Sequence, residues 1–428
     1  MTDRRTFLAG AAALGVAAFR ADALARAAGA GRDLGSLDDL AAAARDEDYW
    51  GQIQRCFDTD RTVINLNNGG VSPAPNDVME AMIRDLRFAN SSPVQNMWRV
   101  SEPRAESVRR DIAREFGCDP EEIAITRNAS EAMEALIFGV DLKPGDEVIH
   151  TDQNYPRMQT SWQQRARRDG VVVKKISFPI PMRSPDVLLD RIKEAITPRT
   201  KVIELPQVTN WSGQGMPIRE VVELGREKGI EVFVDGAHGF AHVPFRRDDL
   251  GCDYFGSSLH KWLMAPIGTG FLYVRKSKIK SIWPLMGADP PLDEDIRKFE
   301  QIGTHPAANH NAISVAAAFH RAIGPERKAA RLIHLRDRWA APLLEADPRV
   351  KLLTPLEPGW GWGIGLLSVE GVDCGKLFGY LWDKHRIVIS PTKHEQFEGI
   401  RVSPSVYTTV EEIDIFVDAM KKALADGV

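Results

Sequence analysis

One stretch decides the fold, residues 231–276, which read EVFVDGAHGFAHVPFRRDDLGCDYFGSSLHKWLMAPIGTGFLYVRK. Its first apolar run, Glu231–Asp235, is typical of a β-strand and ends in a carboxylate. A second such run, Asp253–Ser257, is followed by Lys261 in a mostly apolar setting. Because a partly buried carboxylate needs a positively charged partner, the pattern predicts that Asp235 and Lys261 belong to one site.

This pair matches the requirements of pyridoxal phosphate (PLP). A lysine amine bonds the cofactor, and a carboxylate keeps its pyridine nitrogen protonated so that the ring accepts electrons. Taken singly, Asp235 is better interpreted as a cap of the following turn and Lys261 as a surface ammonium. Their combination with the motifs described below favours the cofactor site.

Outside this stretch the chain alternates strands and helices. The other β-rich runs are Glu122–Thr126, Glu147–Thr151, Val171–Ile176 and Lys201–Leu205. The amphipathic stretches between strands are Ser130–Phe138, Arg157–Arg168, Pro185–Ile196 and Pro217–Lys228. This alternation predicts an α/β fold with a mainly parallel sheet covered on both faces. The ligand site of such a sheet lies at the carboxyl ends of its strands.

A change of pattern near residue 326 predicts a second, smaller α/β domain over residues 326–428, after a large domain over residues 71–325. Its expected elements are a long charged helix at Glu326–Glu345, strands near Val350–Leu353, Gly363–Val369 and Ile387–Ile389, and a final helix at Val410–Leu424.

Composition narrows the classes of function. The 428 residues carry a formal net charge of −4, whereas non-specific nucleic-acid binding needs a basic surplus, so no nucleic-acid partner is expected. The four cysteines lack CxxC spacing, which gives no reason to expect a disulfide framework or a metal site. No GxGxxG motif follows a strand and no GxxxxGK[ST] motif occurs, which argues against a binding site for NAD or ATP.

The N-terminus resembles a twin-arginine (Tat) export signal. Arg4 and Arg5 precede a small-residue apolar run from Ala9 to Ala18, and Ala23-Leu24-Ala25 offers a cleavage site. We therefore expect residues 1–30 to be a signal peptide, the Tat translocase to be a partner, and the protein to be periplasmic or exported. No other apolar run reaches the length of a membrane span.

Residues 60–425 resemble aminotransferase class V, a family of fold-type I PLP enzymes, and most resemble its isopenicillin-N-epimerase-like branch. The motifs that carry the resemblance are TRNASEA at 126–132, DQNYP at 152–156, TNWSG at 209–213, the S-x-H-K pattern at 258–261 and GIRVSPSVY at 399–407. The resemblance implies a homodimer that binds PLP, built on a seven-stranded sheet with residues 31–70 bordering the active site.

The resemblance also implies roles for individual residues. Those implied for cofactor binding are Lys261, Asp235, His238, Tyr155 (stacked on the ring), Asn210, Ala129, Ser130, Ser258, His260 and Thr304, the last reaching the partner's phosphate across the dimer. Those implied for the amino-acid substrate are Arg401, as receptor of its α-carboxylate, with Asn67 and Asn210. Lys261 is the expected catalytic base.

The reaction class follows less directly from these residues. Cysteine desulfurases need a cysteine shortly before the arginine, and residues 390–398 contain none. The branch resemblance favours an epimerase or racemase acting on an amino acid or a compound bearing one. An aminotransferase, or a C–S or C–Se lyase without a catalytic cysteine, is the alternative. Epimerisation needs a second proton donor, for which His305, His394 and Tyr407 are candidates.

Overall fold

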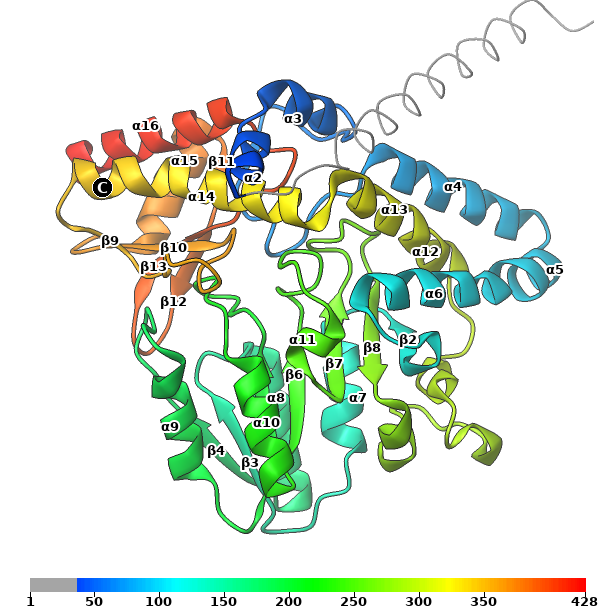
Figure 1. Cartoon of the computed structure of the whole chain (residues 1–428). Coiled ribbons are helices and arrows are strands. Elements are labelled where there is room, and N and C mark those ends of the chain that lie inside the picture. Colours follow the sequence, from blue (N-terminus) through cyan, green and yellow to red (C-terminus); the bar gives the residue numbers. More distant parts are fainter. Residues whose placement is uncertain (1–36) are drawn as a thin grey trace, which may run out of the picture.

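The computed structural model describes residues 37–428, so the predicted signal peptide lies outside the described residues. Among the described residues, no helix combines the length and apolar character needed to span a membrane. The chain forms a large domain around one sheet and a C-terminal domain around another (Figure 1).

The large domain is built on a seven-stranded sheet in the order β2-β8-β7-β6-β5-β3-β4. Its strands are β2 (Ile123–Thr126), β3 (Glu147–Thr151), β4 (Val172–Ile176), β5 (Thr200–Pro206), β6 (Glu231–Asp235), β7 (Tyr254–Ser258) and β8 (Gly270–Val274). All neighbours pair in parallel except β8, which runs antiparallel to both β2 and β7. The predicted mainly parallel sheet is confirmed, whereas β8 was not anticipated.

Helices cover both faces of this sheet, as the alternation of side chains requires. On β6, Phe233 packs with α7 (Ala129–Gly139) and α8 (Pro156–Asp169). Val232 and Val234 point to the other face. The helices that contribute to that second face are α4 (Asn76–Ser91), α6 (Ala105–Phe116), α9 (Pro185–Ala195), α10 (Ile218–Lys228) and α13 (Ile313–Ile323).

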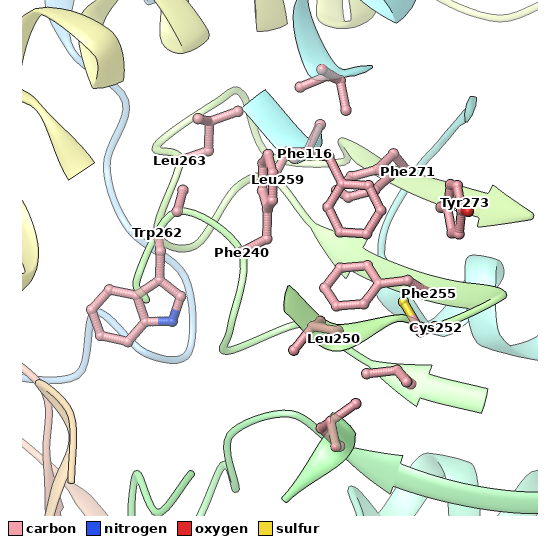
Figure 2. Close-up of a cluster of buried hydrophobic side chains, with 14 of the residues drawn as sticks. Phe116, Phe240, Leu250, Cys252, Phe255, Leu259, Trp262, Leu263, Phe271 and Tyr273 are labelled. Carbon is pink, nitrogen blue, oxygen red and sulfur yellow. The ribbon is translucent and has the colours of Figure 1, made fainter. Parts of the chain in front are cut away.

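An aromatic cluster fills the second face next to the loop between β7 and β8. Figure 2 shows Phe116 from α6 above Phe255 of β7, with Phe271 and Tyr273 of β8 beside them. The ring centroids of Phe116 and Phe255 lie 4.7 Å apart. Full burial of a side chain of this size contributes about 2–3 kcal/mol, so the cluster anchors the β7–β8 connection that carries Lys261.

The C-terminal domain contains a four-stranded antiparallel sheet in the order β12-β13-β10-β9. Its elements are α14 (Pro325–Ala346), β9 (Val350–Leu352), β10 (Gly365–Val369), α15 (Cys374–His385), β11 (Ile387–Val388), β12 (Ser390–Lys393), β13 (Glu398–Val402) and α16 (Val410–Asp426). The three long helices and the sheet enclose a separate apolar core. The expected strand at Ile387–Ile389 is shorter and lies outside this sheet, and β12 and β13 were not anticipated.

The N-terminal part of the described chain ties the two domains together. After α2 (Leu37–Ala44) and α3 (Glu47–Gln54), β1 (Ile64–Asn65) pairs in parallel with β11. Further along, the Gly69 amide donates to Ser403 Oγ at 2.9 Å, and the Ser72 amide donates to the carbonyl of His260 at 3.0 Å. This segment therefore contacts both sides of the site described next.

Candidate active site

A cavity of about 330 Å³ lies at the carboxyl ends of β5, β6 and β7. The predicted site residues that line it are Ala129, Ser130, Tyr155, Asn210, Asp235, His238, Ser258, His260, Lys261 and Arg401. Of the predicted set, only Asn67 and Thr304 do not line it. Side chains from both domains thus meet in one cavity, as expected for a ligand site at the edge of a parallel sheet.

Lys261 presents its amine to the cavity. Burial lowers the pKa of Lys261 to about 8; Asp235 raises this value and the Arg401 cation lowers it. Lys261 Nζ lies 3.2 Å from His238 Nε2, and the indole N–H of Trp262 donates to His238 Nδ1 at 3.3 Å. Because an indole only donates, the proton of a neutral His238 sits on Nε2 and is donated to the Lys261 amine. Burial keeps His238 neutral by lowering its pKa well below the usual value.

Asp235 ends β6 and accepts a hydrogen bond from the Ala237 amide at 2.9 Å. Burial raises the pKa of Asp235, and this outweighs the Ala237 amide and the Lys261 charge, which both lower it. A second acid, Glu204 on β5, is fully buried and accepts a hydrogen bond from Trp162 Nε1 at 2.5 Å. Burial, reinforced by Asp235, raises the pKa of Glu204 to about 8. Glu204 was missed by sequence reasoning, although a glutamate inside the apolar run of β5 signals a buried acid.

The first turn of α7 borders the cavity and has the groups needed to hold an anion. The Ala129 amide donates to Ser258 Oγ at 2.9 Å, which leaves the Ser258 hydroxyl proton for a ligand. Gly270 permits this approach, since a Cβ there would lie 2.7 Å from the backbone of Asn128. A helix N-terminus with neighbouring hydroxyl groups is a favourable place for a phosphate. Ser130 and His260 also line the cavity.

Arg401 enters the cavity from β13 of the C-terminal domain. Its Nη1 donates to the carbonyl of Asn210 at 2.9 Å and its Nη2 donates to Asn67 Oδ1 at 2.7 Å, while Nε is buried without a partner. Burial lowers the pKa of Arg401 to about 10, so the guanidinium is charged at neutral pH. A charged guanidinium whose Nε–H has no hydrogen-bond partner is suited to bind a carboxylate. Asn67 contacts Arg401 from outside the cavity.

The remaining predicted residues lie elsewhere. Thr304 is exposed and outside the cavity, and its contact with a partner subunit stays a prediction. His305 lines a separate cavity of about 210 Å³. His394 Nε2 lies 3.1 Å from the carbonyl of Asp152, and the Tyr407 hydroxyl donates to Asn68 at 2.7 Å. None of the three candidate second proton donors lines the cavity, so those assignments are not supported within this chain.

The residues present fit PLP. The buried Asp235 carboxylate, the Lys261 amine, the anion site at α7 and the unpartnered Arg401 Nε supply complementary groups for a pyridinium, an aldehyde, a phosphate and a carboxylate. Fold and site together define a PLP-dependent enzyme of fold-type I.

The family follows from comparison with known proteins. The aminotransferase class-V model matches residues 64–416, and the chain belongs to this family. Family membership together with the donor set identifies PLP as the cofactor of this chain.

Individual relatives carry different activities in their names. Isopenicillin N epimerase of Streptomyces clavuligerus is 28% identical over 388 residues, which cover 87% of this chain and 97% of that protein. A probable cysteine desulfurase of Mycolicibacterium paratuberculosis is 30% identical over 343 residues, covering 74% of this chain and 48% of that protein. The apo structure of a cysteine desulfurase from Thermococcus onnurineus NA1 has a TM-score of 0.77 at 22% identity, covering 90% of this chain and 98% of that one, which shows the shared fold.

Proposed function

We propose that the protein is an epimerase or racemase acting at the α-carbon of an amino acid, or of a compound that carries one. The observation that carries the proposal is a single cavity holding both Arg401 and a Lys261 amine whose pKa is lowered to about 8, with no described cysteine among its lining residues. The near full-length similarity to isopenicillin N epimerase is consistent with it.

The roles of the residues follow from their chemistry. Arg401 binds the α-carboxylate and thereby orients the α-carbon toward Lys261. When bound, PLP supplies a ring that accepts electron density from the α-carbon. Lys261, whose pKa of about 8 leaves a substantial neutral fraction near that pH, takes the α-proton as a general base.

The absence of a suitably placed cysteine weighs against cysteine-dependent chemistry. Cys374 is the described cysteine nearest in sequence to Arg401, and its Sγ lies 3.7 Å from the carbonyl of Thr392 inside the C-terminal domain. Burial raises the pKa of the Cys374 thiol, whereas a nucleophilic cysteine needs a lowered pKa.

The test is to incubate the holoenzyme in heavy water with L- and D-amino acids and dipeptides, followed by chiral separation and mass spectrometry. We expect at least one compound to gain one α-deuterium and to appear as its other stereoisomer with its skeleton intact. Keto acid with recovered aminated acceptor would instead identify an aminotransferase, and loss of a β-substituent would identify a lyase. Either result would replace the epimerase proposal.

A further inference from the structure

Inversion at a carbon atom raises a question that Lys261 alone does not answer. A proton removed from one face of the α-carbon must be replaced by a proton on the opposite face, which in a two-base reaction requires a second proton-transfer group. The side chains with ionisable groups that line the cavity are Tyr155, Asp235, His238, His260, Lys261 and Arg401.

Four of these groups are held in contacts that make them unsuitable as the second proton-transfer group. His238 lies 3.2 Å from Lys261 Nζ and therefore belongs to the same side of the cavity. Asp235 is tied to the Ala237 amide at the end of β6. His260 Nδ1 lies 3.1 Å from the carbonyl of Thr269. Arg401 is held by Asn210 and Asn67, and a guanidinium with a pKa of about 10 is a poor proton donor at neutral pH.

Tyr155 has the position and the freedom that the others lack. It is the residue before α8 and is 42% exposed, so solvent can exchange its proton. Its ring centroid lies 6.0 Å from Lys261 Nζ, with the amine over the face of the ring, and both side chains line the cavity. Among the described residues the Tyr155 hydroxyl makes no hydrogen bond, whereas the Tyr407 hydroxyl is tied to Asn68.

Arg401 lies close to Tyr155, and the interaction between the two side chains opposes the lowering of the pKa of Arg401 by burial. The proposed receptor of the substrate carboxylate and the Tyr155 ring therefore line the same cavity as neighbours.

We propose that Tyr155 is the second catalytic residue, which exchanges a proton with the face of the α-carbon opposite Lys261. This inference rests on the epimerase function proposed above. In one direction the α-C–H bond breaks, its proton goes to the neutral Lys261 amine, and the electron pair stays with the substrate. The Tyr155 O–H bond then breaks, its proton and that electron pair form the new C–H bond, and the phenolate remains. Solvent returns Lys261 and Tyr155 to their starting protonation states, and the reverse direction exchanges the two roles.

The test uses Tyr155→Phe, which removes the hydroxyl and keeps a ring able to stack on the cofactor. Holoenzymes of the wild type and of the variant are incubated in heavy water with separate L- and D-amino acids, and α-deuterium and inversion are measured independently. We expect inversion to fall by about 10²-fold or more. One stereoisomer, whose α-proton faces Lys261, should retain deuterium exchange within about threefold of the wild type. Exchange into the other stereoisomer should stop.

Two controls separate this role from a structural one. PLP affinity, measured by absorbance titration of the apoprotein, should change by less than about twofold in Tyr155→Phe, because the ring is retained. Tyr380→Phe removes a phenol on α15 whose hydroxyl contacts Asp426, and its ratio of inversion to exchange should equal that of the wild type.

Each result has a distinct meaning. Tyr155→Phe that inverts its substrate at the wild-type rate would overturn the assignment while leaving the epimerase function intact. Equal loss of exchange in both stereoisomers together with weak PLP binding would assign Tyr155 to cofactor positioning and would also overturn it. A wild-type enzyme that exchanges α-hydrogen in no amino acid or dipeptide would overturn the proposed function, and this inference with it.

Discussion

The edge of the parallel sheet and the β12–β13 hairpin contribute side chains to the cavity in different ways. The sheet places Asp235 and Lys261 through strands whose order and direction follow from the chain's alternation of elements. The hairpin brings Arg401 from an antiparallel sheet in another domain, held by Asn67 and the Asn210 carbonyl. The proposed cofactor and substrate contacts therefore rest on separate frameworks, which we expect mutations to disturb independently.

The largest effect is expected when the sheet's contribution is removed. Lys261→Ala eliminates the amine that bonds the cofactor and serves as base, so α-hydrogen exchange should fall by at least about 10³-fold. Borohydride reduction followed by mass spectrometry should find no PLP covalently attached to this variant.

Lys328 provides the matched control, because it is a second buried lysine, with a pKa lowered by burial to about 7, that does not line the cavity. Lys328→Met should still carry covalent PLP after reduction, although loss of the hydrogen bond to the Trp262 carbonyl should lower its melting temperature. Covalent PLP in Lys261→Ala would show that the two lysines have been misassigned.

The next largest effect is expected on the hairpin side. Arg401→Ala removes the proposed carboxylate receptor, and kcat/KM should fall by about 10²-fold, which corresponds to about 3 kcal/mol for a charged hydrogen-bonded pair. PLP affinity of the apoprotein should stay within about twofold, because the anion site at α7 and Asp235 are untouched. Equal losses of substrate and PLP binding would contradict the separation of the two frameworks.

A smaller effect is expected of pH on the rate at which PLP attaches to Lys261, the lysine placed by the parallel sheet. The Lys261 amine must be neutral to attack an aldehyde, and its pKa is about 8. The second-order rate of PLP attachment to the apoprotein should therefore rise about tenfold per unit up to pH 8 and level off above it. Stopped-flow absorbance measures this rate. A plateau beginning only near pH 10.5 would show that burial does not lower this pKa.

The smallest effect is expected at the tip of the hairpin. Gln396 Nε2 donates to Asp152 Oδ2 at 2.5 Å, and the hairpin extends from the C-terminal domain toward the large domain (Figure 1). Gln396→Ala should raise KM about fivefold, equivalent to about 1 kcal/mol, with PLP affinity unchanged. Glu395→Ala is the control, since Glu395 pairs with Lys175 at the surface and such pairs contribute little. An equal effect of both variants would show that the Asp152 contact does not position the hairpin.

The difference between the two frameworks also decides what sequence could predict. Strand ends in an alternating α/β pattern predict where Asp235 and Lys261 meet, because parallel strands bring their carboxyl ends to one edge. The hairpin carries no comparable signal, since Pro391 and Gly399 interrupt its β-rich character and its pairing is set by distant strands. The strand β8 was missed for a related reason, because it returns antiparallel without an intervening helix.

Proton-transfer partners were the least predictable part of the site. His305, His394 and Tyr407 have suitable chemistry, but whether a side chain enters a cavity depends on packing that local sequence does not encode. Tyr155 was predicted from the family's pattern as a stacking residue. The 6.0 Å separation of its ring from Lys261 Nζ became visible only with both side chains in place.

The contacts of Asn67 and Gly69 with the C-terminal domain have a consequence for biosynthesis. Gly69 pairs with Ser403, 334 positions later, and Asn67 orients Arg401. Ribosomes deliver a chain from its N-terminus, so the seven-stranded sheet can assemble while the segment around Gly69 still lacks its partner. The cavity wall that carries Arg401 therefore closes only after Ser403 has emerged from the ribosome, whereas Lys261 emerges well before it.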